Sequence, residues 1–214
     1  RAITFPGAGE EAFSAGADIG RFAEERRDSA SARRYAERFE AGVEVVDSCS
    51  KPTLSLIKGF CVGGGCELAS ATDIRVAAEN ARFGVPVARL GLVAGYGELR
   101  RFVNLIGPGR TLDMMLSARL FDAREAFQMG FVSALHPLGR VDEEGRRLAA
   151  RIAELAPLVH AWHKRFVRTL LKDPGLERLS EGELALQYAC FDTEDFREGT
   201  RAFLEKRKPR FRGR

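Results

Sequence analysis

Three consecutive glycines followed by a carboxylate are the residues of this sequence best suited to chemistry. The apolar run Thr53–Ile57 leads into Gly63, Gly64 and Gly65, and Glu67 follows in a helix-like segment. Glycines allow the backbone to turn sharply and allow a ligand to approach the main chain closely. A helix that begins here directs free N–H groups and its positive dipole end at that ligand. The pattern predicts an oxyanion hole with an acid or base beside it.

A plainer interpretation of the same glycines stays open at this point. Most glycine-rich turns between a strand and a helix serve close packing or bind a phosphate. The segment lacks the spacing G-x-x-x-x-G-K-[ST], which excludes a P-loop, and the triplet does not match a dinucleotide-binding fingerprint. The choice between packing and catalysis therefore depends on other parts of the chain.

The elements that must position these residues alternate between short apolar runs and helical stretches. The runs expected to form strands are residues 2–5, 53–57, 74–77 and 131–135. The segments expected to form helices are residues 31–46, 64–72, 110–116 and 124–129. Such alternation indicates an α/β class with crossover connections between strands. From about residue 141 onward the pattern is helical only.

The composition, 45% hydrophobic and 30% charged among 214 residues, is typical of a globular protein. No segment approaches the roughly 20 apolar residues of a membrane span, and no targeting sequence is visible. We therefore expect a cytoplasmic protein without a membrane partner. Cys61 and Cys66 have no second ligand pair nearby, and His160 and His163 have no third partner, so we expect no metal site.

Several motifs along the chain occur in the order found in one enzyme family. They are E-A-F-S-A-G-A-D-I at 11–19, K-G-F-C-V-G-G-G-C-E-L-A at 58–69, A-T-D-I-R-V-A at 71–77, A-R-F-G-V-P at 81–86, G-P at 107–108, A-x-x-A-x-x-x-G-F-V at 123–132 and E-G-x-x-A-F-x-E-K-R at 198–207. This series resembles the crotonase superfamily of acyl-CoA enzymes, whose best-known members are the enoyl-CoA hydratases and isomerases. The resemblance covers nearly the whole chain.

The resemblance implies a fold and an assembly that periodicity does not reveal. The expected fold is a spiral of ββα units over residues 1–152, followed by a helical trimerisation region over residues 153–214. The expected assembly is a homotrimer or a dimer of trimers. Family members usually carry some tens of residues before this point, which form the first strands and part of the coenzyme A site. We therefore expect that the N-terminal strands of the core are missing from this chain.

The resemblance also implies a site for the thioester. The backbone N–H groups of Ala17 and Gly64 match the pair that holds the thioester oxygen as it becomes an enolate. Preorganised donors of this kind are each worth about 3 kcal/mol in other oxyanion holes. No cofactor is implied, because the coenzyme A thioester is itself the substrate. Further residues that match substrate-binding or coenzyme A-binding segments are Ala15, Gly16, Asp18, Ile19, Gly63, Val87, Phe203 and Lys206.

One position departs from the pattern of the hydratases. Glu67 matches the first of their two catalytic glutamates, which helps to hold and activate water, but the second position is Val87. Valine neither donates nor accepts a proton, so we expect slow hydration of simple enoyl-CoAs and an apolar wall at residue 87. Tyr96 or Glu98 is a candidate to supply the missing group. The alternative is that Glu98 is a solvent-facing residue at the start of a helix.

The basic C-terminus accounts for the positive net charge of +4. Residues 206–214 carry six basic groups, and without them the net charge is about −2. The rest of the chain therefore lacks the basic charge expected of a nucleic-acid-binding protein. Aromatic residues near this tail are limited to Phe203 and Phe211, too few for base stacking. The tail is either a solvated end or an aid to binding the phosphates of coenzyme A.

Three functions stay open on the sequence alone. The first is hydratase or isomerase chemistry on an acyl-CoA with Glu67. The second is other enolate chemistry, such as decarboxylation, thioester hydrolysis or carbon–carbon hydrolysis, in which a second glutamate is dispensable. The third is non-catalytic binding of acyl-CoA or RNA. The presence of Glu67 favours the first two, because a pure binder has no need of a carboxylate at the reacting carbon.

Overall fold

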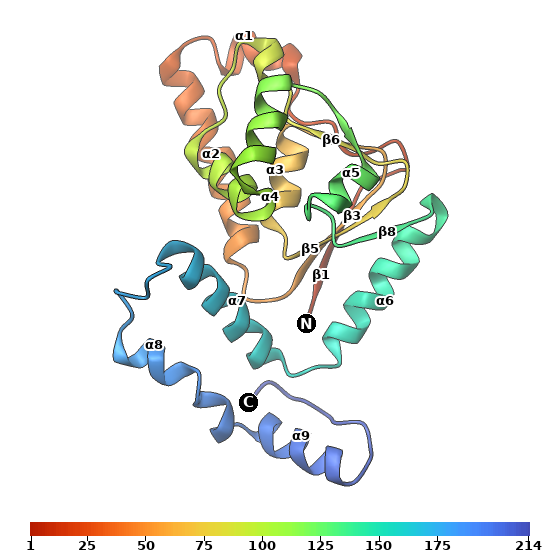
Figure 1. Ribbon diagram of the computed structural model, residues 1–214, viewed down its shortest axis with the longest axis vertical. Helices are drawn as coiled ribbons and strands as arrows, with labels where there is room; N and C mark the ends of the chain where they lie inside the picture. The colour runs from red at the N-terminus through yellow and green to blue at the C-terminus, as the bar shows by residue number, and fades with distance from the viewer. The chain divides into compact units, whose positions relative to one another are not determined.

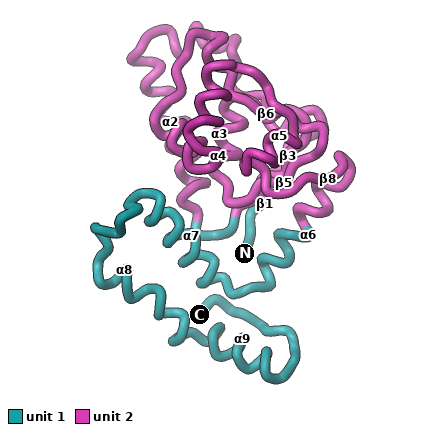
Figure 2. Tube along the Cα trace, viewed as in Figure 1, with its two compact units in different colours: residues 1–3, 50–52, 147–214 teal, residues 4–49, 53–146 magenta.

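The computed structural model describes residues 1–214, which divide into two compact units. Figure 1 shows the elements, and Figure 2 shows the two units in different colours. The larger unit comprises residues 4–49 and 53–146, and the smaller one comprises residues 1–3, 50–52 and 147–214. The domain boundary predicted between residues 152 and 153 falls inside the smaller unit, and this division into domains stays a prediction.

Two four-stranded sheets form the framework of the fold. Their orders are β1-β3-β5-β8 and β2-β4-β6-β7. The pairs of β3 with β5, β5 with β8, β2 with β4 and β4 with β6 are parallel, whereas β6 and β7 are antiparallel. The strand bounds are β1 (Ile3–Pro6), β2 (Ala12–Ser14), β3 (Thr53–Ile57), β4 (Phe60–Val62), β5 (Ile74–Ala78), β6 (Arg82–Gly84), β7 (Phe121–Asp122) and β8 (Ala134–His136).

Helices follow the strand pairs in a repeating order. The α-helices are α1 (Phe22–Glu25), α2 (Ser29–Ser48), α3 (Gly64–Ala71), α4 (Tyr96–Ser117), α5 (Ala123–Gln128), α6 (Val141–Ala153), α7 (Pro157–Lys172), α8 (Glu181–Leu186) and α9 (Glu194–Leu204). Short 3-10 helices are η1 (Ile19–Arg21), η2 (Val87–Leu90), η3 (Leu138–Arg140) and η4 (Ala189–Asp192). Each of the first three turns places one strand in each sheet before a helix (α2, α3 or α4), so the predicted ββα spiral is confirmed.

The expected elements differ from the observed ones mainly at α4 and β8. The helix expected from residue 110 begins at Tyr96, and Gly107, with φ of 75°, interrupts it before Pro108. This non-helical glycine explains why the periodic pattern was recognisable only after the kink. The strand expected over residues 131–135 begins at Ala134, because the Phe131 and Val132 N–H groups donate to the Ala126 carbonyl at the end of α5 instead.

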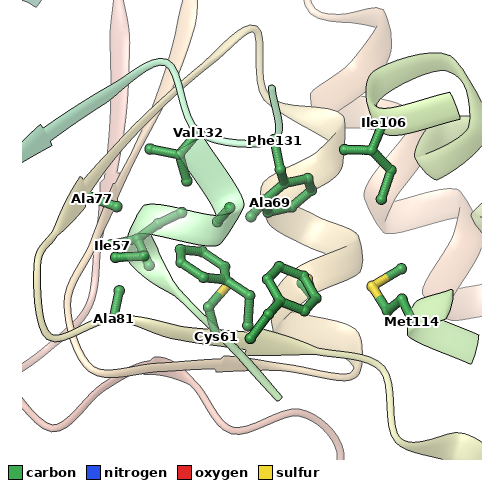
Figure 3. Close-up of a cluster of buried hydrophobic side chains, with 14 of the residues drawn as sticks. Ile57, Cys61, Ala69, Ala77, Ala81, Ile106, Met114, Phe131 and Val132 are labelled. Carbon is green, nitrogen blue, oxygen red and sulfur yellow. The ribbon is translucent and has the colours of Figure 1, made fainter. Parts of the chain in front are cut away.

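The hydrophobic core of the larger unit lies around a set of phenylalanines. The Phe83 ring centroid is 5.9 Å from that of Phe121 and 5.6 Å from that of Phe131. Figure 3 shows Phe131 gathered with Ile57, Cys61 and other apolar side chains of this cluster. Burial of such side chains supplies most of the driving force for folding, about 25 cal/mol for each Å² of apolar surface removed from water. The core therefore fixes the strands and helices that position the glycine triplet.

Helix α3 begins within the glycine triplet, with Gly63 as its N-cap, and contains Glu67; a buried arginine binds the C-terminal end of the helix. The Arg75 side chain is 4% exposed and donates to the carbonyls of Ala69, Thr72 and Phe131. A cation is favourable at a helix C-terminus, where it meets carbonyls that have no intrahelical partner. Burial lowers the pKa of Arg75 to about 10, so the guanidinium stays charged at neutral pH.

We expect the Arg75→Leu variant to lose about 3–4 kcal/mol of unfolding free energy, because it leaves buried carbonyls without donors. Urea unfolding of the two proteins measures this difference. The matched control is Arg82→Leu, which removes an exposed arginine from β6 and is expected to change stability by no more than about 0.5 kcal/mol. Equal unfolding midpoints for Arg75→Leu and Arg82→Leu would contradict the role of Arg75 at α3.

Candidate active site

A cavity of about 370 Å³ lies against the N-terminal end of α3 in the larger unit. Its walls come from the loop after β2, from α1 and α2, from the β4–α3 turn, and from η2 with the segment that leads into α4. The sequence-predicted residues that line it are Ala15, Gly16, Ala17, Ile19, Gly63, Gly64, Glu67, Val87 and Glu98. The fold therefore brings residues from four separate segments to one place.

The remaining predicted residues do not line this cavity. The Asp18 carboxylate accepts a hydrogen bond from the Gly20 N–H and caps η1. Tyr96 is 94% exposed at the start of α4 and does not line the cavity. Phe203, which is 84% exposed, and Lys206 belong to the smaller unit, and their part in binding coenzyme A stays a prediction.

Close backbone packing positions the N-terminus of α3. Gly16 has φ of 94°, and a side chain there would lie 2.9 Å from the Val62 carbonyl oxygen and 3.4 Å from the Gly64 nitrogen. A side chain at Gly65 would lie only 2.5 Å from the Ser14 carbonyl oxygen. Glycine is thus required on both sides of this contact. The contact holds the segment that contains Ala17 against the first N–H groups of the helix, which have no intrahelical acceptor.

The Glu67 carboxyl is the buried ionisable group of the cavity. Its residue is 7% exposed, in the first turn of α3. Burial, and to a lesser degree the charge of Glu98, raises the pKa of Glu67 to about 8, whereas the charge of Arg101 lowers it. Burial disfavours the charged form of a carboxyl because the carboxylate loses its hydration. A carboxyl that titrates near neutral pH is suited to take up and release protons.

Two further carboxylates near Glu67 are held by hydrogen bonds. The Glu98 carboxylate accepts from the Gly95 N–H at 2.6 Å, which caps α4 while Glu98 still lines the cavity. The Glu40 carboxylate of α2 accepts two hydrogen bonds, of 2.8 and 2.7 Å, from the buried guanidinium of Arg101 on α4. The Arg101 guanidinium lowers the pKa of Glu40, so this carboxylate stays ionised and paired.

Sequence reasoning missed the wall of the cavity formed by α1 and α2. Tyr35 and Phe39 of α2 line the cavity together with Phe22 and Arg26 from the α1 region. The α2 positions 32, 35, 36 and 39 follow the spacing of one helical face, so this periodicity was a usable signal in the sequence. Arg26 carries no such signal, because a single arginine in a charged segment is indistinguishable from a solvated one.

Comparison with known proteins identifies the family. A sequence model described as enoyl-CoA hydratase/isomerase matches residues 1–214. The chain belongs to this family. A crotonyl-CoA hydratase from Syntrophomonas wolfei subsp. wolfei is 33% identical over 209 residues, which cover 98% of this chain and 79% of that protein. The resemblance to the crotonase superfamily seen in the sequence is therefore confirmed.

Solved structures of the enoyl-CoA hydratase/isomerase family have the same fold. An enoyl-CoA hydratase/carnithine racemase from Magnetospirillum magneticum has a TM-score of 0.95 and 38% identity, over 100% of this chain and 79% of its own. An enoyl-CoA hydratase from Bacillus anthracis has a TM-score of 0.87 and 30% identity, over 100% of this chain and 82% of its own. No helix of the chain has the length and apolar character needed to cross a membrane.

Proposed function

We propose that this family member adds water to, or moves the double bond of, an enoyl-CoA thioester bound in the cavity. The observation that carries the proposal is the position of Glu67, a buried carboxyl that shares the cavity with Ala17 and Gly64. The N–H groups of these two residues form the oxyanion hole for the thioester oxygen. Hydrogen-bond donors fixed where charge develops lower the energy of the enolate without reorganisation.

In the proposed hydration, the Glu67 carboxylate accepts a proton from a water molecule. The water oxygen forms a bond to the β-carbon, and the electrons of the double bond move toward the thioester oxygen. The resulting enolate then takes a proton at its α-carbon. Hydratases with two glutamates divide these tasks, but the apolar Val87 occupies the second position and lines the cavity. Glu98 lines the same cavity and, in its protonated form, gives this proton to the α-carbon. Transfer of the proton that Glu67 took from water to the Glu98 carboxylate then restores both groups.

The assembly and the coenzyme A contacts are also proposals. We propose a homotrimer or a dimer of trimers in which α7, α8 and η4 lie at subunit contacts. Large apolar side chains are exposed on these elements, and contiguous apolar surface is typical of protein interfaces. Phe203 and Lys206 are proposed to contribute to coenzyme A binding near the basic tail. The exposed apolar residues that support this assembly are Val167, Leu170, Leu171, Leu184 and Phe191.

Hydration of crotonyl-CoA, followed by loss of the absorbance of the conjugated thioester, tests this function. We expect slow but measurable turnover, with kcat/KM rising as the pH increases through about 8, because the carboxylate of Glu67 is the active form. A pH profile that falls through this range would contradict the role of Glu67 as the base. No turnover of any enoyl thioester would refute the proposed reaction.

Val87 supports a second candidate function. Enolate chemistry that needs only the oxyanion hole and one carboxyl, such as decarboxylation or thioester hydrolysis, does not require a proton donor at residue 87. Malonyl-type, β-hydroxyacyl and branched thioesters assayed side by side with crotonyl-CoA distinguish the two. Release of carbon dioxide or of free coenzyme A at a rate above crotonyl-CoA hydration would favour this second function.

A further inference from the structure

We propose that Arg26 binds a carboxylate at the far end of the acyl group, so that the preferred ligands are coenzyme A thioesters of dicarboxylic acids. This inference rests on the proposed function, which places the acyl group in the cavity. It adds a substrate class to that function, and it comes from the one guanidinium that lines the cavity.

Two aromatic rings hold the Arg26 guanidinium at the wall of the cavity. Its central carbon lies 3.7 Å from the ring centroid of Tyr35 and 4.2 Å from that of Phe22. All three residues line the cavity. Contact with two ring faces leaves the edge of the planar guanidinium available, and this edge carries its N–H donors.

The donors of Arg26 have no acceptor in the protein. The Nε atom is buried without a hydrogen-bond partner, and no carboxylate forms an ion pair with the guanidinium. The neighbouring acid Glu25 is paired with Arg21, and Glu40 is paired with Arg101. A buried donor without an acceptor is costly, so native proteins rarely keep one that a ligand does not use.

The chemistry of the unpaired guanidinium specifies the ligand. Its fork of N–H donors matches the two oxygens of a carboxylate, which it binds through two parallel hydrogen bonds. Neither Glu67 nor Glu98 reaches it, although its charge acts on Glu67. Arg26 lies against Phe22 and Tyr35 on the wall formed by the α1 region and α2, whereas Glu67 lies in the first turn of α3. If the proposed function places the thioester at the start of α3, a carboxylate at Arg26 belongs to the part of the acyl group that extends away from the thioester. A cation on an otherwise largely apolar wall also disfavours a plain alkyl chain.

Equilibrium binding by titration calorimetry tests the proposal without requiring turnover. The probes are succinyl-, glutaryl- and adipyl-CoA, each paired with a neutral thioester in which an isopropyl group replaces the terminal carboxylate. We expect the carboxylate probe to bind at least about tenfold more tightly at one of the three lengths, as one charge-assisted interaction allows. Arg26→Met, which keeps an unbranched apolar side chain against the rings, is expected to remove this preference.

The matched control is Arg27→Met, which changes an exposed arginine of the same segment that does not line the cavity and is expected to keep the preference. Equal affinity of the paired probes at all three lengths would overturn the proposal even if no variant folds. A preference that survives Arg26→Met would also overturn it. An equal loss of affinity for free coenzyme A in Arg26→Met would overturn it too, because Arg26 would then bind phosphate.

The inference and the proposed function fail separately. Turnover of crotonyl-CoA without a preference for the carboxylate probes refutes only this inference, whereas that preference without turnover refutes only the proposed reaction.

Discussion

Glu67→Gln is expected to reduce kcat for crotonyl-CoA by about 100- to 10,000-fold, the usual contribution of general acid–base catalysis. Glutamine has nearly the shape of glutamic acid, and the cavity walls that contact the acyl group and the start of α3 are unaltered. The affinity for coenzyme A thioesters should therefore change little. Stopped-flow assays for turnover, together with calorimetric binding of butyryl-CoA, separate the two effects.

The control for this substitution is Glu37→Gln, which changes an exposed glutamate of α2 that does not line the cavity. This variant should retain the full rate. Unchanged turnover in Glu67→Gln would remove Glu67 from the mechanism. A loss of binding equal to the loss of rate would instead mean that the carboxyl shapes the cavity and does not transfer protons.

The same substitution has a second expected consequence, for stability. The pKa of Glu67 is about 8 in the folded protein and near 4.5 for an ordinary glutamate, so the folded state binds the proton more tightly. Stability associated with this group is therefore present below pH 4.5 and is lost as the pH rises to about 8. Glutamine has no charge to desolvate, so Glu67→Gln should melt at a higher temperature than the unaltered protein at pH 9. Such a gain in stability with a loss of activity is typical of an active-site acid.

The sequence was most informative where backbone geometry demands particular residues. A side chain at Gly16 would collide with the Val62 carbonyl of β4, and one at Gly65 would collide with Ser14 of β2, so the backbone of the site requires glycine at both positions. Strand β3 was predicted at its observed bounds, Thr53–Ile57, and the structure buries all five of its residues. Long apolar runs and special backbone positions are local properties, and one sequence is enough to recognise them.

The sequence was less informative where function depends on contacts between distant segments. Arg101 and Glu40 form an ion pair although they are 61 positions apart in the sequence, and no local pattern around either residue indicates the pair. Tyr96 and Glu98 were equivalent candidates in the sequence. In the structure the Glu98 carboxylate accepts a hydrogen bond from the Gly95 N–H, whereas the Tyr96 ring is exposed. The strands β2, β4 and β6 have three residues each, too few for a periodicity of two to be recognised.

Val87→Glu is expected to raise the rate of crotonyl-CoA hydration by about 100-fold, because it places a carboxyl at the position that matches the second glutamate of the hydratases, in a cavity that already contains Glu67 and Glu98. Val87 is half-buried at the start of η2 and lines the cavity, so a longer side chain at this position can extend toward the acyl group. A third carboxyl also raises the pKa values of its neighbours by like-charge repulsion. The pH at which the variant reaches half of its maximal rate should therefore lie above that of the unaltered protein.

Val87→Gln is the matched control, since it has the size and polarity of the glutamate without its proton chemistry. A gain in Val87→Glu that is absent from Val87→Gln would show that the rate was limited by the missing acid, and that the natural reaction of this cavity uses Glu67 with little help. Equal rates in the two variants would contradict that view. Fast hydration by the unaltered protein would do so as well, because Glu98 would then already supply the α-carbon proton. The comparison therefore distinguishes a hydratase in which Glu98 gives the α-carbon proton from an enzyme whose enolate chemistry requires no second carboxyl.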